Sequence, residues 1–306
     1  MYFNGIVALL EHNRNRDHIS VGSNPYSEDW GEIVRELHRK SSNIVAGDFE
    51  GFDASQNQQM LTAAGDVLIE LSGMFCGSTP EDKRVMQTLM CSLTSSLHIT
   101  GDEVYQWTHS LPSGHYLTAI INSVFVNLAF SCIWQLAFKQ VSYMCARSFW
   151  EECGIVAYGD DHLVSIPEHR LSTFSQLTVP HLFRCIGLSY TMEDKDAVAT
   201  DEARHITQVS YLKRTFAQDK SGRWVAPLTL DSVLESPMWV HSTPDIIAQT
   251  NNVLDWALKE LSLHTEDTWE RWAPVLIREQ RRLGYFTQFV DWSETRTCAL
   301  GQEFRI

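Results

Sequence analysis

The sequence predicts an α+β fold in which strands and helices are mixed up to about residue 226 and helices alone follow. Short apolar segments bounded by Gly and Asp, such as Asn43–Asp48 and Ile155–Tyr158, have the length and composition of strands. Longer segments with apolar residues every three or four positions predict helices. A chain of 306 residues that is 44% hydrophobic and 20% charged can bury a sizeable core, so a globular fold is expected.

The predicted helices begin with Glu28–Lys40, in which Trp30, Ile33 and Leu37 share one face. Another helix is expected to start just after Pro80. The full set is 28–40, 56–74, 81–95, a long helix after Gly114 that ends near Gln140, 171–182, 243–263 and 265–283. The last two have the strongest periodicity, and a soft domain boundary is expected near Pro227, before them.

The predicted strands alternate with turn residues. Hairpins are expected to join 97–100 to 104–107, 155–158 to 162–166, and Phe216 to 224–226. Single strands are expected at 43–48, 189–192 and 208–212. Because strands and helices are mixed before residue 227, the main body is expected to be α+β.

Charge and cysteine content exclude some classes of protein. The formal net charge of −14 by itself argues against a nucleic-acid-binding protein, since phosphate contacts require Lys and Arg. Clustered carboxylates for a divalent metal would also make a chain acidic. The seven cysteines are an odd number and contain no C-x-x-C, which argues against a disulfide scaffold or structural zinc and favours a reducing, intracellular compartment.

The apolar segment Ala119–Phe138 is long enough to be mistaken for a membrane span. However, Asn122, Asn127, Ser131 and Gln135 recur along one side of the expected helix. We therefore expect a core helix and no membrane span. The first ten residues lack the basic flank and length of a signal peptide.

The strongest chemical signal is Tyr158-Gly159-Asp160-Asp161 between two predicted strands. Two adjacent carboxylates at a hairpin tip repel each other, and a divalent cation such as Mg²⁺ would relieve the repulsion. The alternative is a solvated Gly-Asp turn, which is common in β proteins.

A second signal is Asp48-Phe49-Glu50-Gly51-Phe52-Asp53, in which Asp48 closes an apolar strand. Asp48 could simply end the strand, and Asp53 could cap the next helix. Two-metal phosphoryl transfer requires carboxylates from separate segments around metals about 3.5–4 Å apart. Asp48, Asp160 and Asp161 could supply them if their strands were neighbours.

A third signal is Leu111-Pro112-Ser113-Gly114 with Thr118 and Asn122 behind it. Gly114 permits a ligand to approach the backbone closely, and Thr118 and Asn122 lie four residues apart on one helical face. The alternative is a helix capped by Ser113, with Asn122 buried in the core.

Two basic segments complete the pattern. Lys195 lies in Glu193-Asp194-Lys195-Asp196 and could donate a proton to a leaving group, or form only a solvated ion pair. Lys213 and Arg214 follow a predicted strand and could hold a phosphate backbone, or form an ordinary charged strand end.

In this order, these segments resemble the palm motifs of viral RNA-dependent RNA polymerases. The matching residues are Asp48 and Asp53 (motif A), Ser113, Gly114, Thr118 and Asn122 (motif B), Tyr158–Asp161 (motif C), Lys195 (motif D) and Leu212–Arg214 (motif E). Val21–Ser27 and Val225–Leu228 further resemble the dicistrovirus, iflavirus and marine picorna-like group. The similarity covers nearly the whole chain.

The resemblance implies a right-hand polymerase palm, an antiparallel sheet backed by helices, with a mostly helical thumb and with fingers largely missing. It implies partial fingers at 1–42, palm at 43–226 with a fingers insertion at about 57–110, and thumb at 227–306. It also implies location in the host cytoplasm, at viral replication complexes.

The resemblance also implies the following roles. Mg²⁺, or Mn²⁺ in its place, would be held by Asp48 and Asp160 with support from Asp161; Asp53, Ser113, Gly114, Thr118 and Asn122 would bind the nucleotide and read its ribose; Lys195 would be the general acid; Lys213 and Arg214 would hold RNA. The partners would be an RNA template and primer, ribonucleoside triphosphates and the remainder of a viral polymerase or polyprotein.

The sequence departs from the family pattern in two places. His115-Tyr116-Leu117 is bulkier than the small residues that many relatives have after Ser-Gly, which puts the flexibility of this loop in doubt. The basic fingers motif that grips the triphosphate is not found before Asp48. A fragment of a longer polymerase is therefore expected, and this would also explain the acidic balance.

Three alternatives remain open from the sequence. A reverse transcriptase shares the palm, but Asn122 favours selection of ribonucleotides. A non-catalytic palm that binds RNA or serves a structural role is opposed by the intact Asp48, Asp160 and Asp161. A plain metal-binding α+β protein leaves the motif B segment and Leu212–Arg214 without explanation.

Overall fold

The computed structural model describes residues 2–107, 109–141, 146–194 and 197–301. The chain divides into two compact units, one made of Met1–Ser23 and Glu32–Tyr211 and the other of Asn24–Gly31 and Leu212–Ile306. The division at Tyr211–Leu212 precedes the predicted change to helices near Pro227. The α+β class is confirmed, and the names palm, thumb and fingers for the predicted ranges stay predictions.

A four-stranded antiparallel sheet forms the centre of the first unit. It contains β1 (Ile44–Phe49), β4 (Gly154–Tyr158), β5 (Asp161–Ser165) and β6 (Tyr190–Thr191) in the order β4-β5-β1-β6. Most residues of β1, β4 and β5 are buried, as expected for strands covered on both faces. The predicted strands are confirmed, and β7 (Ser210–Tyr211) matches the predicted strand at 208–212.

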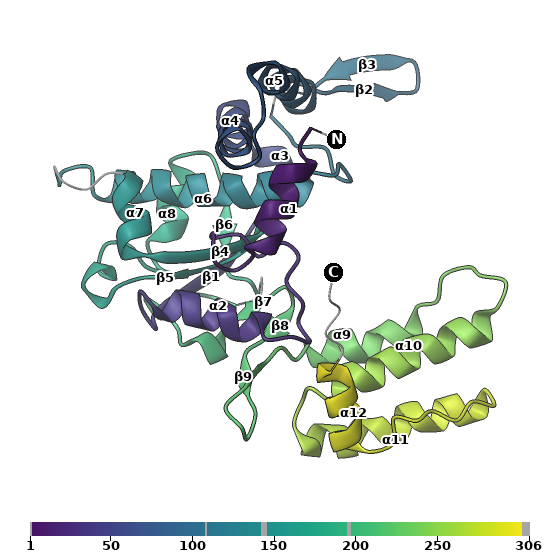
Figure 1. Cartoon of the computed structure of the whole chain (residues 1–306). Helices are drawn as coiled ribbons and strands as arrows, with labels where there is room; N and C mark the ends of the chain where they lie inside the picture. The colour runs from purple at the N-terminus through teal and green to yellow at the C-terminus, as the bar shows by residue number, and fades with distance from the viewer. Residues whose placement is uncertain (1, 108, 142–145, 195–196, 302–306) are drawn as a thin grey trace. The chain divides into compact units, whose positions relative to one another are not determined.

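Helices lie on both faces of this sheet. Figure 1 shows α6 (Thr118–Ala137), α7 (Ala146–Glu152) and α8 (Val179–Arg184) on one face and α2 (Asp29–His38) on the other. The helix α6 has the length and composition of a membrane span, but 72% of its apolar window is buried inside the protein. The prediction of a core helix is confirmed for Asn122, Asn127 and Ser131, which are buried, whereas Gln135 is exposed.

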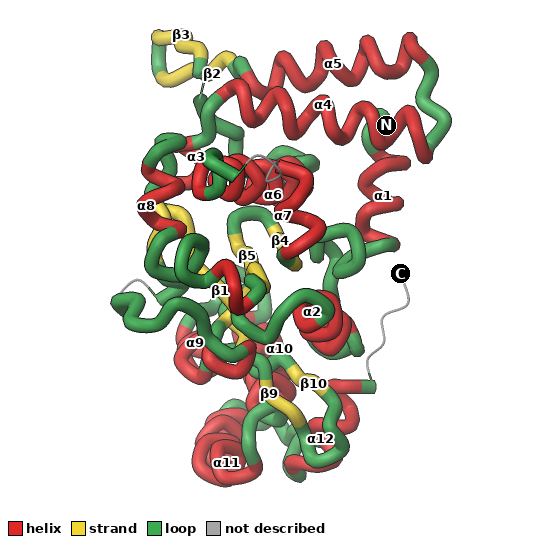
Figure 2. Tube along the Cα trace, turned by 90° about the vertical axis from the view of Figure 1, so that its left-hand side faces the viewer, coloured by secondary structure: helices red, strands yellow, loops and turns green. Residues whose placement is uncertain are grey.

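A helical layer lies beyond α6. Figure 2 shows α4 (Gln58–Phe75) and α5 (Pro80–Thr94) side by side, and the exposed hairpin of β2 (Leu97–Thr100) and β3 (Glu103–Gln106) follows α5. Thr79 and Asp82 form a capping box at the start of α5, with Pro80 in its first turn as predicted. The sequence did not predict α1 (Asn4–His12), α7 or α12 (Trp292–Leu300), which are short helices.

The predicted helix at 171–182 is wrong. The structure has a short 3₁₀ turn at Glu168–Arg170, then irregular turns, and α8 begins only at Val179. The Thr178 hydroxyl accepts from the Ser175 N–H at 2.9 Å and donates to the Thr173 carbonyl at 3.0 Å. Such local side-chain hydrogen bonds compete with a helix, and Pro180 is tolerated only in the first turn of α8.

The second unit is mainly helical, as predicted. It contains β8 (Arg214–Thr215), the hairpin of β9 (Ala217–Gln218) and β10 (Trp224–Val225), α9 (Leu230–Glu235), a 3₁₀ turn at Ser236–Met238, α10 (Ile246–Leu261), α11 (Glu266–Arg282) and α12. Leu254, Leu258 and Leu261 of α10 pack with Trp269 and Leu276 of α11 in one apolar core. Among the described residues, the cysteines are free thiols.

Candidate active site

Carboxylates from two separate segments lie at the same end of the central sheet. In the β1–β5 ladder Gly47 is opposite His162, so Asp48 is one residue beyond this pair and next to the turn that carries Asp160 and Asp161. Asp48 is also paired with Thr191 of β6 and is not the last residue of its strand, since β1 continues to Phe49. The antiparallel register therefore brings motif A beside motif C.

The turn between β4 and β5 has only two residues, Gly159 and Asp160, because Tyr158 pairs with Asp161. Gly159 has φ of 65°, in the left-handed region that favours glycine, and no atom lies within 4 Å of the place where a Cβ would be. Its N–H donates to Ser123 Oγ of α6 at 2.8 Å. The helix that carries motif B thus anchors the turn that carries motif C.

The electrostatic environment of Asp160 favours a cation. Burial raises the pKa of Asp160 above its usual value, and the nearby charges of Asp48 and Asp53 raise it further. Carboxylates that affect one another in this way would all be stabilised by a divalent ion among them. Carboxylate oxygens are the hard ligands that Mg²⁺ prefers, so the chemistry of this donor set fits a divalent cation.

The carboxylates are nevertheless not arranged as a complete set of metal ligands. Among the described residues, no group of three or more His, Cys, Asp or Glu side chains is arranged to hold a metal ion. The Asp48 carboxylate accepts from the N–H of Phe49 at 2.8 Å. Asp48, Asp160 and Asp161 have short side chains that are only half-buried, so rotation of these carboxylates toward an ion would cost little.

Motif A and the motif B loop meet through a direct hydrogen bond. Ser113 Oγ donates to Asp53 Oδ2 at 3.0 Å, and both residues are exposed. Neither residue is the helix cap that each could have been: Gly51 precedes the short helix α3 (Phe52–Ser55), and Leu117 precedes α6. Both groups therefore lie at the surface, and the charge of Asp53 is near enough to raise the pKa of Asp160.

The first turns of α6 hold the remaining residues of motif B. Thr118 Oγ1 donates to the Pro112 carbonyl at 3.2 Å, and Gly114 has φ of 81°. Asn122 is 5% exposed, and its Oδ1 accepts from Gln56 Nε2 at 2.7 Å. Gln56, which is fully buried, therefore orients the amide of Asn122.

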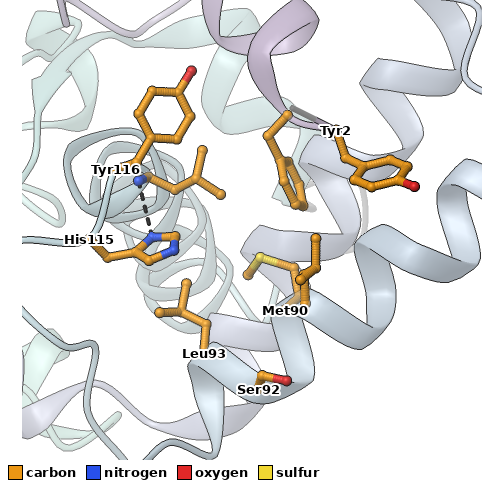
Figure 3. A pocket seen from close by; sticks show the side chains of 9 residues that line it. Tyr2, Met90, Ser92, Leu93, His115 and Tyr116 are labelled. Atoms are coloured by element: carbon orange, nitrogen blue, oxygen red, sulfur yellow. Dashed lines mark hydrogen bonds between the residues drawn. The ribbon is translucent and has the colours of Figure 1, made fainter.

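A cavity of about 360 Å³ lies behind the motif B loop, between the loop, α5 and the N-terminal segment (Figure 3). His115 Nδ1 accepts from the N–H of Leu117 at 3.1 Å, Tyr116 is 60% exposed, and Leu117 is buried. The bulky residues that distinguish this loop thus border this cavity, opposite Met90 and Leu93 of α5.

The sequence analysis missed one histidine and one tyrosine near the turn, His162 and Tyr190. His162 and Tyr190 are hydrogen-bonded to each other in the core behind Asp160. Burial lowers the pKa of His162 to about 4, so its ring is neutral at pH 7. The sequence gives no sign of these roles, because the partners are distant along the chain. The same holds for Ser123 and Gln56, which look like ordinary residues of helical segments.

The predicted basic residues are Lys195, Lys213 and Arg214. Lys195 lies outside the described residues. Lys213 is exposed and, with φ of 59°, has left-handed backbone geometry. Arg214 is largely buried and forms two hydrogen bonds with Glu260, at 2.7 and 2.8 Å. An RNA contact by Lys213 or Arg214 stays a prediction, and the Arg214 guanidinium already has a protein partner.

The comparison with known proteins decides the family. The family profile described as "Viral RNA-dependent RNA polymerase" matches residues 1–292. This chain belongs to the viral RNA-dependent RNA polymerase family. The resemblance inferred from the motifs is therefore confirmed for the family, and the assignment of individual residues to motifs A to E stays a prediction.

Similar proteins agree with this family. The chain is 32% identical over 290 residues to the replicase polyprotein of acute bee paralysis virus, covering 92% of this chain and 15% of that polyprotein. It is 30% identical over 280 residues to the replicase polyprotein of Drosophila C virus, covering 88% of this chain and 16% of that polyprotein. The chain thus spans about one sixth of these relatives.

A solved structure has the same fold. The Sicinivirus 3Dpol RNA-dependent RNA polymerase superposes with a TM-score of 0.78 at 19% sequence identity, over 98% of this chain and 59% of that chain. At this identity the likeness concerns the fold alone. It supports the α+β polymerase architecture predicted from the motifs.

Proposed function

We propose that this chain is the palm and thumb part of a template-directed RNA polymerase that copies a viral RNA genome. The observation that carries the proposal is the meeting of Asp48 with the Asp160–Asp161 turn at one end of an antiparallel sheet. The family match and the replicase relatives support RNA as both template and product. Residues 43–226 would form the palm and 227–306 the thumb.

In this proposal Asp48 and Asp160 would hold two Mg²⁺ ions, or Mn²⁺ in their place, with Asp161 in support. The bound ions would polarise the attacking oxygen and neutralise the charge on the leaving group. A primer 3′-hydroxyl attacks the α-phosphorus of a ribonucleoside triphosphate, the bond from this phosphorus to the bridging oxygen of the β-phosphate breaks, and pyrophosphate leaves. Most of the rate would come from positioning and charge neutralisation.

The chain's own residues would select the substrate and move the proton. The hydrogen-bonded pair of Ser113 and Asp53, together with Asn122, would bind the hydroxyl groups of the ribose. Thr118 and Gly114 would shape the loop around the nucleotide. Lys195 would donate a proton to the pyrophosphate, and Lys213 would contact RNA.

The rest of the machinery would be supplied by further polymerase sequence. This chain covers 59% of the solved relative, and the grip on the triphosphate would come from basic residues in the part of a polymerase that this chain does not cover. The proposed location is the host cytoplasm, at viral replication complexes.

The test is nucleotide incorporation on a primed RNA template with Mg²⁺ or Mn²⁺, by this chain and by a form extended upstream. Asp160→Asn should reduce incorporation at least a thousandfold, because the charge that holds the ion is lost. Asp102→Asn is a matched control. Asp102 also follows a glycine with positive φ in a hairpin turn, Gly101-Asp102 with φ of 60° at Gly101, but this turn belongs to the exposed hairpin β2–β3.

Incorporation that requires Asp160 and tolerates Asp102→Asn would support the polymerase. Full activity of Asp160→Asn would overturn the metal assignment. Absence of incorporation by the folded, extended form with varied templates and metals would favour the non-catalytic palm instead.

A further inference from the structure

The main-chain carbonyl of Asp160 is held by a side chain from the next strand. His162 Nδ1 lies 2.7 Å from this carbonyl oxygen, and His162 Nε2 lies 2.9 Å from the hydroxyl of Tyr190. A carbonyl can only accept a hydrogen bond, so Nδ1 carries the ring proton. Nε2 and the Tyr190 hydroxyl form the second hydrogen bond of the ring.

Tyr190 reaches His162 across the strand that lies between them. The sheet order is β5-β1-β6, and His162 of β5 is paired with Gly47 of β1. A Cβ at residue 47 would lie 2.4 Å from Cζ of Tyr190 and 2.5 Å from its hydroxyl. The Tyr190 side chain therefore occupies the space that the missing side chain of Gly47 leaves open.

The same strand β6 is also tied to Asp48. Thr191, next to Tyr190, is paired with Asp48 in the β1–β6 ladder. Asp160 is thus joined to β6 through His162 and Tyr190, and Asp48 is joined to β6 through the backbone. The main chains of Asp160 and Asp48 are therefore held by separate connections to one dipeptide, Tyr190-Thr191.

We propose that His162 and Tyr190 are positioning residues that fix the Asp160 main chain relative to Asp48, so that both carboxylates bind metal ions at the separation the reaction requires. The inference rests on the proposed function for its catalytic consequence. The hydrogen bonds act through the Asp160 backbone, and neither ring needs to touch substrate or metal. Gly47 is a further element of this connection, since it makes room for Tyr190.

The competing explanation is that both rings only fill the core. His162 is 2% exposed and contacts the rings of Phe49 and Phe130, and Tyr190 contacts Phe183. Under that explanation an apolar replacement of similar volume should serve as well as the native side chain, and a smaller polar one should be worse. The positioning explanation predicts the opposite order.

Four variants separate the two explanations. His162→Asn keeps a donor where Nδ1 lies, and so can still bind the Asp160 carbonyl. His162→Gln places its amide where Nε2 lies and keeps the partner of Tyr190 only. His162→Leu removes both hydrogen bonds, and Tyr190→Phe removes only the hydrogen bond at Nε2.

The first measurement is steady-state incorporation by the upstream-extended chain. We expect kcat to fall at least tenfold in His162→Leu, severalfold in Tyr190→Phe and His162→Gln, and less than threefold in His162→Asn, with KM for the nucleotide within about twofold throughout. Thermal unfolding identifies any variant that has lost its fold. An activity of His162→Leu equal to or above that of His162→Asn would overturn the proposal.

The second measurement does not depend on catalysis. Binding of Mn²⁺ to the protein without RNA or nucleotide, followed by electron paramagnetic resonance, should be at least fivefold weaker in folded His162→Leu than in His162→Asn. Equal binding in the two variants would overturn the proposal. If His162→Leu binds Mn²⁺ more weakly than His162→Asn but the wild type incorporates no nucleotide, the polymerase assignment fails while the positioning role stands.

Discussion

The Arg214–Glu260 pair provides a direct test of what a motif E cation does. The Glu260 side chain is fully buried and the Arg214 side chain is 12% exposed. Arg214 donates from both terminal nitrogens to Glu260 and also to the Ala226 carbonyl at 2.8 Å. Tyr26 donates a further hydrogen bond to Glu260 and lies under the guanidinium.

Arg214→Ala would leave the Glu260 carboxylate buried without its cation. Removing one partner of a buried ion pair costs about 3–5 kcal/mol, whereas replacing both partners by apolar groups is often neutral. We therefore expect Arg214→Ala to lower the free energy of unfolding by about 3–5 kcal/mol. Arg214→Met combined with Glu260→Leu should recover most of this loss.

The assay is urea unfolding, with hydrogen exchange of α10 amides as a local measure of the same unit. Arg282→Ala is the control, because its pair with Glu279 is 73% and 39% exposed, and it should change the free energy of unfolding by less than about 1 kcal/mol. An Arg214→Ala protein as stable as the wild type but with weakened RNA binding would refute this reasoning. It would assign Arg214 to RNA instead.

Three further predictions follow from the described contacts. Asp53→Ala should reduce discrimination against deoxynucleotides about tenfold in single-turnover incorporation, since one hydrogen bond near the ribose is lost; unchanged discrimination would contradict this. Gly47→Ala should lower the free energy of unfolding in urea by about 1–3 kcal/mol, because its Cβ would lie 2.4 Å from the Thr191 carbonyl oxygen. Gly101→Ala is the control: no atom lies near its Cβ, so the protein should lose only the free energy needed to hold an alanine at a φ of 60°. Burial lowers the pKa of His264, so the unfolded chain takes up the proton first and the free energy of unfolding should fall as pH drops below about 6.5. His264→Gln should show a smaller fall in this free energy between pH 7 and 5, and an equal fall in both proteins would refute the prediction.

Sequence reasoning succeeded where local pattern determines structure. The Gly101-Asp102 and Gly159-Asp160 turns were located because a glycine followed by an acid between two strand segments has few other uses. The long helices α10 and α11 were located because their periodicity is sustained over many turns. The helix predicted at 171–182 failed because apolar spacing there is outweighed by hydrogen bonds of Thr178.

The sequence by itself determined the family, the α+β class and the residues that carry the proposed chemistry, because motif order is a property of the chain alone. Only the tertiary structure decided how those residues are held. The register of β1 against β5 brings Asp48 beside Asp160, and Tyr190 reaches His162 through the space at Gly47. Arg214 was likewise assigned an internal partner only when α10 brought Glu260 to it. Each of these contacts joins residues far apart along the chain, and such pairs are selected by packing and burial, which no local pattern records.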